Sequence, residues 1–96
     1  MKKIKIEIPD GKDLVFEGEK IARAADRITE LVLWRTKGGK YVVERTIGKN
    51  KQGEIYHSAK DASSVIDFYK SVGKELIKNA QSKDKAFEGL TEKRIE

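Results

Sequence analysis

The sequence predicts a single α+β domain in which an antiparallel sheet of four to five strands is followed by one long C-terminal amphipathic helix packed on one face. Three observations carry this prediction. Apolar and polar residues alternate through much of the first half of the chain, turn residues separate the alternating segments, and the apolar spacing becomes helical after residue 58. A chain of 96 residues has room for one modest core.

The first hairpin is predicted from the alternation of isoleucines over residues 4–8, which ends at Pro9-Asp10-Gly11. Residues 14–22 then return as a second strand, in which Gly18 marks a bulge or a close approach of another backbone. The stretch that follows also fits helical spacing. We divide it by a turn at Asp26-Arg27, because the residues after that turn are rich in β-branched and aromatic side chains.

The second hairpin joins residues 28–36 to residues 41–47 through Gly38-Gly39, which we expect to form a two-residue turn. This loop sets a register in which Thr36 lies opposite Tyr41. One face of the hairpin then carries Ile28, Val32, Trp34, Tyr41 and Val43, and the other face carries Leu31, Leu33 and Val42.

After a polar loop at residues 48–53 and a short strand at 54–57, Ser58 is placed to cap a helix. The helix is predicted from an apolar stripe at helical spacing. Gly73 within it indicates close contact with the sheet. The stripe consists of Ala62, Val65, Ile66, Tyr69, Val72, Leu76, Ile77 and Ala80.

We therefore expect one domain over residues 1–80 and a charged tail over residues 81–96. The tail has two alternatives: it is frayed, or it forms a short helix that docks Phe87 and Leu90.

Composition narrows the classes of function. No apolar run reaches the roughly 18 to 20 residues that span a bilayer, and a chain without cysteine fits a reducing cytoplasm. His57 is the only histidine, and we interpret it as structural rather than as a general base. We expect no enzyme activity, no catalytic residues, no cofactor, no metal site and no small-molecule substrate.

Positive charge is concentrated on the second hairpin and the loop after it. Residues 34–53 hold six basic side chains against the single acid Glu44, a local balance of +5 that equals the net charge of the whole chain. With Trp34 and Tyr41 among them, these residues offer one hypothesis, a nucleic-acid-binding surface. A solvated edge that discourages aggregation is the other interpretation. The basic residues are Arg35, Lys37, Lys40, Arg45, Lys49 and Lys51.

The hairpin is predicted to be apolar on both faces, although one helix covers only one of them. The second face, with Leu31, Leu33 and Val42 rimmed by Arg35 and Glu44, is therefore our predicted protein interface. A free edge of the sheet is the alternative route to a protein partner. A partner protein, a second copy of the chain in a homodimer, or the tail would cover it.

Residues 29–43, preceded by Phe16-Glu17-Gly18-Glu19, resemble uncharacterised small proteins carried on bacterial plasmids, phages and integrated elements. The resemblance covers the middle third of the chain and implies a cytoplasmic accessory protein of a mobile element. We thus expect a small non-catalytic protein-binding module, with nucleic-acid binding through hairpin 34–53 as the alternative.

Overall fold

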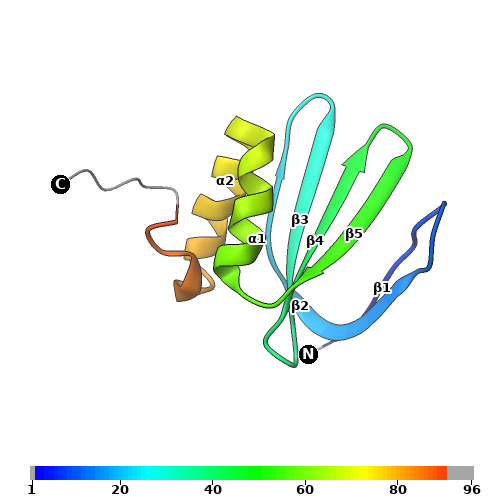
Figure 1. Ribbon diagram of the computed structural model, residues 1–96, viewed down its shortest axis with the longest axis horizontal. Helices are drawn as coiled ribbons and strands as arrows, with labels where there is room; N and C mark the ends of the chain where they lie inside the picture. Colours follow the sequence, from blue (N-terminus) through cyan, green and yellow to red (C-terminus); the bar gives the residue numbers. More distant parts are fainter. Residues whose placement is uncertain (1, 91–96) are drawn as a thin grey trace.

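The computed structural model describes residues 2–90 and confirms the predicted fold class. Five antiparallel strands follow one another along the sheet in chain order, and a helical segment follows them on one face (Figure 1). Each strand pairs with its sequence neighbour, so every connection within the sheet is a hairpin. The strands are β1 (Lys2–Ile6), β2 (Leu14–Ala25), β3 (Thr29–Thr36), β4 (Tyr41–Ile47) and β5 (Asn50–Tyr56).

The turns predicted between the strands are present, but one strand was underestimated. The side chain of Asp26 accepts hydrogen bonds from the backbone N–H groups of Ile28 and Thr29, which closes the β2–β3 turn. The polar loop predicted at residues 48–53 contains only Gly48 and Lys49, because β5 begins at Asn50. The last strand is therefore seven residues long instead of a short addition.

The register predicted for the β3–β4 hairpin is wrong by one residue. Arg35, not Thr36, lies opposite Tyr41. Thr36 N–H donates to the carbonyl of Lys40, so the loop has three residues, and only Gly39 has a positive φ, of 83°. A shift of one residue turns every side chain of one strand to the opposite face. Tyr41 and Val43 consequently share the helix-covered face with Leu33, while Val42 lies on the other face.

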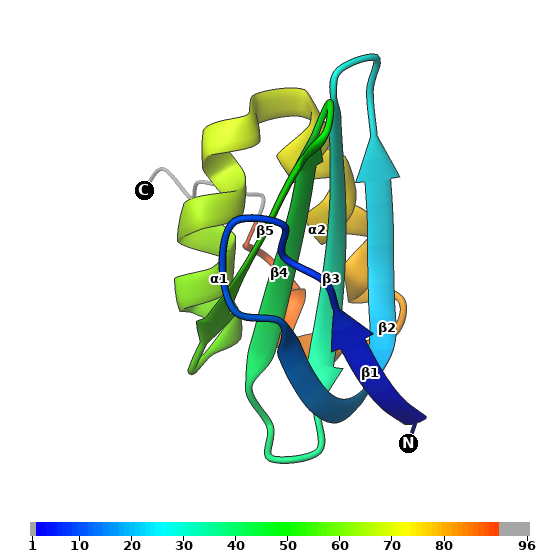
Figure 2. The same ribbon diagram turned by 90° about the vertical axis from the view of Figure 1, so that its right-hand side faces the viewer.

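Part of the second face of the sheet is covered by the chain's own first hairpin. Strand β2 is twelve residues long and carries a bulge between Lys20 and Ala22. The sheet curls along this strand, so that β1 and its loop cross in front of the later strands (Figure 2). Leu14 lies against Gly53 of β5, where an added Cβ would be 2.6 Å from its Cδ1 atom. Phe16 meets Trp34 edge-on at 6.0 Å between ring centroids.

The helical segment packs on the other face and is divided in two. Helix α1 (Ala59–Ile66) is followed by a 3-10 turn, η1 (Asp67–Tyr69), and then by α2 (Lys70–Gln81). Ser58 caps α1 as predicted, since its Oγ accepts from the N–H of Asp61 at 3.1 Å. The chain turns back at Lys70, which has a φ of 52°, and α1 and α2 pack against each other.

Gly73 makes a close contact, but with α1 instead of the sheet. A Cβ on Gly73 would lie 2.0 Å from the carbonyl oxygen of Ile66. The prediction at Gly18 is confirmed, because a Cβ there would lie 2.4 Å from the carbonyl oxygen of Arg35 on β3.

The docking alternative holds for the described part of the tail. A 3-10 turn, η2 (Lys85–Phe87), places Phe87 in the core with no exposed surface, and Leu90 packs partly against the same core. The ring of Phe87 meets that of Tyr41 edge-on at 5.2 Å. Residues 91–96 of the predicted tail lie outside the described residues.

Candidate functional site

Strand β5 is one of the two edges of the sheet, and β1 is the other. All seven of its residues are exposed or half-buried. Ile55 is an exposed large apolar side chain, with 54% of its surface accessible. An edge strand offers unpaired N–H and C=O groups to another chain, and proteins usually block such pairing with charge, proline or a cover.

The two edges differ in charge. Strand β1 carries Lys2, Lys3 and Lys5 within five residues. Within residues 2–90, only Lys5 among them has a carboxylate nearby, that of Asp13 at 3.8 Å, so a second strand with positive charge is repelled at β1. Strand β5 carries one lysine and one glutamate, and Lys51 is paired with Glu44 of β4 at 3.2 Å. The β5 edge is thus close to neutral and has less electrostatic protection than β1.

The β4–β5 loop determines which β5 amides face outward. Ile47 and Asn50 lie opposite each other across Gly48-Lys49, and Gly48 has a φ of 59°, as the first loop position of a type II′ turn requires. The pair that flanks such a turn is hydrogen-bonded, and hydrogen-bonded pairs recur at every second position of an antiparallel ladder. The amides of Lys51, Gly53 and Ile55 consequently point away from β4.

A small pocket lies beside β5 on the helix-covered face. It has a volume of about 80 Å³ and opens between β4, β5 and the end of α1. Arg45 donates to the hydroxyl of Tyr69 at 2.5 Å, and Tyr56 donates to Glu54 at 2.5 Å. Burial, together with the hydrogen bond to Glu54, raises the pKa of Tyr56, so the phenol stays protonated at neutral pH. The lining residues are Val43, Arg45, Gln52, Glu54, Tyr56, Val65 and Tyr69.

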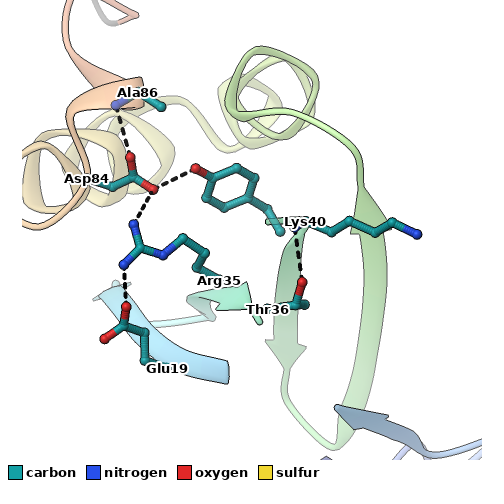
Figure 3. A network of polar contacts seen from close by, with 7 residues as sticks. Glu19, Arg35, Thr36, Lys40, Asp84 and Ala86 are labelled. Atoms are coloured by element: carbon teal, nitrogen blue, oxygen red, sulfur yellow. Dashed lines mark hydrogen bonds and ion pairs between the residues drawn. The ribbon is translucent and has the colours of Figure 1, made fainter. Parts of the chain in front are cut away.

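A partly buried polar network joins the segment after α2 to β2, β3 and β4 (Figure 3). Asp84 accepts from the hydroxyl of Tyr41 at 2.6 Å, from Arg35 at 3.2 Å and from the N–H of Ala86 at 3.0 Å. Arg35 also pairs with Glu19 of β2. Every member of this network has partners, so its evident role is to fasten the segment after α2 to the sheet.

The pKa values of this network follow from burial and pairing. Burial by itself raises the pKa of Asp84, but the hydrogen bonds from Tyr41 and Ala86 and the charge of Arg35 outweigh it, so the net shift is downward. Burial, with the hydrogen bond to Asp84, raises the pKa of Tyr41 to about 12. The carboxylate and the neutral phenol are therefore the stable forms at neutral pH.

The five residues of the predicted interface do not lie on one exposed surface. Leu31 and Leu33 have no exposed surface and face the helices. Val42, which is 1% exposed, and Glu44 lie on the opposite face, which the first hairpin partly covers. Arg35 belongs to the Asp84 network. The physical reason is the one-residue shift in register, together with the curl of the sheet.

The six basic residues of the predicted nucleic-acid surface are also separated. Lys37 and Lys40 lie at the β3–β4 loop, whereas Lys49 lies at the β4–β5 loop, at the other end of β4. Arg35 and Arg45 are engaged on the helix-covered face, and Lys51 is paired on the other. Lys37 is within 3.6 Å of Glu17. These residues do not form a single basic patch.

His57 is exposed in the short link between β5 and α1. Within residues 2–90, no three histidine, aspartate or glutamate side chains lie close enough together to hold a metal ion. In the same part of the chain, no helix is both long and apolar enough to cross a membrane.

Comparison with family models, with curated proteins and with solved structures finds no match to this chain. The resemblance of residues 29–43 to proteins of mobile elements thus stays a prediction.

Sequence reasoning allowed a free sheet edge as a partner site but did not assign it to β5, and it missed Asp84. Gly53 suggested a loop, although it is a strand residue that makes room for Leu14. Asp84 lies 49 residues from Arg35 in the sequence, and no local pattern joins the two. The one available signal for β5 was the alternation of Gln52, Glu54 and Tyr56, three polar or aromatic residues that share one face.

Proposed function

We propose that this chain is a non-catalytic protein-binding module, and that it holds an extended segment of a partner protein along β5. The observation that carries the proposal is the difference in charge between the two edge strands. Strand β1 carries three lysines, whereas β5 is nearly neutral and has Ile55 exposed. Strand addition gives affinity through backbone hydrogen bonds, for which Lys51, Gly53 and Ile55 supply outward amides.

The pocket beside β5 supports the same proposal, because strand-addition sites gain specificity from pockets for alternate side chains. A strand paired with β5 places every second side chain on the helix-covered face, next to Gln52 and Glu54. The pocket of about 80 Å³ accepts one small side chain there. A cytoplasmic location and an accessory role for a mobile element belong to this proposal, in keeping with a cysteine-free sequence.

The test replaces Ile55 with lysine, which adds to β5 the kind of positive charge that discourages strand pairing at β1. Ile28→Lys is the matched control, since Ile28 is also exposed, at 71%, but lies in the β2–β3 turn. Tagged versions of both variants and of the parent chain are used to capture proteins from a host lysate. Captured proteins are identified by mass spectrometry, and the best candidate is purified for titration.

We expect the parent and Ile28→Lys to bind the purified partner equally and Ile55→Lys to bind at least about tenfold more weakly, a change of about 1.4 kcal/mol. Equal binding by all three proteins would rule out β5. Light scattering on the free chain provides a second outcome. If the parent chain is a dimer that the Ile55→Lys substitution dissociates, the partner is a second copy of the chain. If the lysate capture recovers nucleic acid instead of protein, the result favours nucleic-acid binding, the alternative function.

A further inference from the structure

A second surface lies at the opposite side of the sheet, where β1 begins beside the bulge of β2. It is an open groove of about 560 Å³, which falls within the roughly 300 to 1,000 Å³ usual for small-molecule sites. The groove draws on four separate parts of the chain, namely β1, β2, β3 and the segment after α2. Its lining residues are Lys2, Ile4, Gly18, Glu19, Lys20, Trp34 and Lys83.

The groove is strongly basic. Lys2, Lys20 and Lys83 line it, and none of the three has a carboxylate within 4.0 Å among residues 2–90. The single acid, Glu19, is already paired with Arg35. Three cations around a concave surface favour an anionic ligand, because their fields add within the groove.

Trp34 gives this groove an aromatic wall of fixed orientation. Its indole N–H donates to Glu44 at 3.1 Å, and the ring of Phe16 meets it edge-on at 6.0 Å. The ammonium group of Lys20 lies 5.5 Å from the centre of the indole ring in a cation–π contact, which a base stacked on that face of the ring would replace. The side chain is half-buried and is therefore partly accessible.

The backbone explains why the groove is open. Among residues 2–90, β1 pairs with β2 only as far as the Lys2–Gly18 pair, so Glu19 and Lys20 have no β1 partner in this part of the chain. Gly18 also allows β2 to approach the carbonyl of Arg35 closely, and the bulge after Lys20 turns the strand.

From these features we infer that the groove binds a nucleotide, with the base stacked on Trp34 and the phosphate held by Lys2, Lys20 and Lys83. A flat aromatic wall beside clustered cations matches a planar base that carries a phosphate. This site shares only Trp34 with the basic hairpin considered from the sequence, and it is independent of the β5 edge.

Trp34 is the only tryptophan in the chain, so its fluorescence reports on this groove alone. The probe is adenosine 5′-monophosphate, with adenosine and inorganic phosphate as partial ligands, and excitation is at a wavelength that adenine does not absorb. The variants are Lys20→Glu and Lys83→Glu. Lys60→Glu, an exposed residue of α1 outside the groove, is the charge-matched control.

We expect saturable quenching by the monophosphate that is unchanged in Lys60→Glu and weakened about tenfold by each groove variant. Adenosine and phosphate are each expected to bind more weakly than the intact nucleotide. Linear, unsaturable quenching, or equal quenching in all variants, would overturn the inference. Quenching by a short single-stranded oligonucleotide but not by the monophosphate would also overturn it and would assign the groove to nucleic acid.

Discussion

At the scale of single residues, Asp84 is the side chain that ties the segment after α2 to the sheet. It brings together Arg35 of β3 and Tyr41 of β4, and it also caps the short η2 turn through the N–H of Ala86. Such a satisfied network is costly to break, because its remaining buried groups then lose their partners. Figure 3 shows Asp84 between Arg35 and the backbone of Ala86.

The raised pKa of Tyr41 predicts a dependence of stability on alkaline pH. Its pKa is about 12 in the folded chain and about 10 when unfolded, so the folded state holds the phenolic proton more tightly. This contribution is fully present below pH 10 and is lost as the pH rises toward 12. Two pKa units correspond to about 2 to 3 kcal/mol.

The measurement is urea unfolding of the parent and of Tyr41→Phe at a series of pH values. We expect the parent to be more stable below pH 10 and the difference to shrink by about 2 kcal/mol between pH 10 and 12. Tyr56, whose pKa is also raised, is present in both proteins and cancels in the comparison. A difference that stays constant over this range would contradict the assignment.

At the scale of elements, the close packing of α1 on α2 depends on Gly73. The apolar stripe predicted one continuous helix, since it keeps helical spacing from Ala62 to Ala80. The chain instead turns back at residues 67–70, and Gly73 allows the backbones of the two helices to touch. Periodicity alone did not reveal this division, because both helices bury their apolar positions in the same core.

Replacing Gly73 with alanine is expected to destabilise the chain by about 1 to 3 kcal/mol. Alanine favours a helix by about 1 kcal/mol over glycine, but its Cβ would lie 2.0 Å from a backbone oxygen that cannot move by itself. Gly38→Ala is the control, because its nearest contact is at 3.9 Å and its φ is not positive. The measurement is the denaturation midpoint of each variant and of the parent chain. A Gly73→Ala variant as stable as the parent would contradict the close contact between Gly73 and Ile66.

At the scale of the whole molecule, the sequence was sufficient for the first four strands, the main turns and the change to helical period, but it made the last strand too short. It was insufficient for the register of β3 and β4, because Gly38-Gly39 fits a two-residue loop as well as the three-residue loop that occurs. The one-residue difference in register placed Val42 and Val43 each on the face that was predicted for the other. The predicted interface therefore combined residues from opposite faces.

The curl of the sheet was the second feature that local sequence patterns could not predict. Gly18 and the length of β2 are visible in the sequence, but the contact of Leu14 with Gly53 joins residues 39 positions apart. The first hairpin crosses in front of the later strands on the second face (Figure 2), and the two edges of the sheet are β1 and β5. For this reason the proposed partner site is the β5 edge and not the predicted face.

Hydrogen exchange of the β5 amides, followed by NMR in the free chain and in the complex with the purified partner, tests this account most directly. In the free chain we expect Gln52, Glu54 and Tyr56 to be protected by β4, and Lys51, Gly53 and Ile55 to exchange rapidly. In the complex, the second set should become protected while the amides of β1 stay unchanged. Outward β5 amides that exchange equally fast with and without the partner would contradict strand addition.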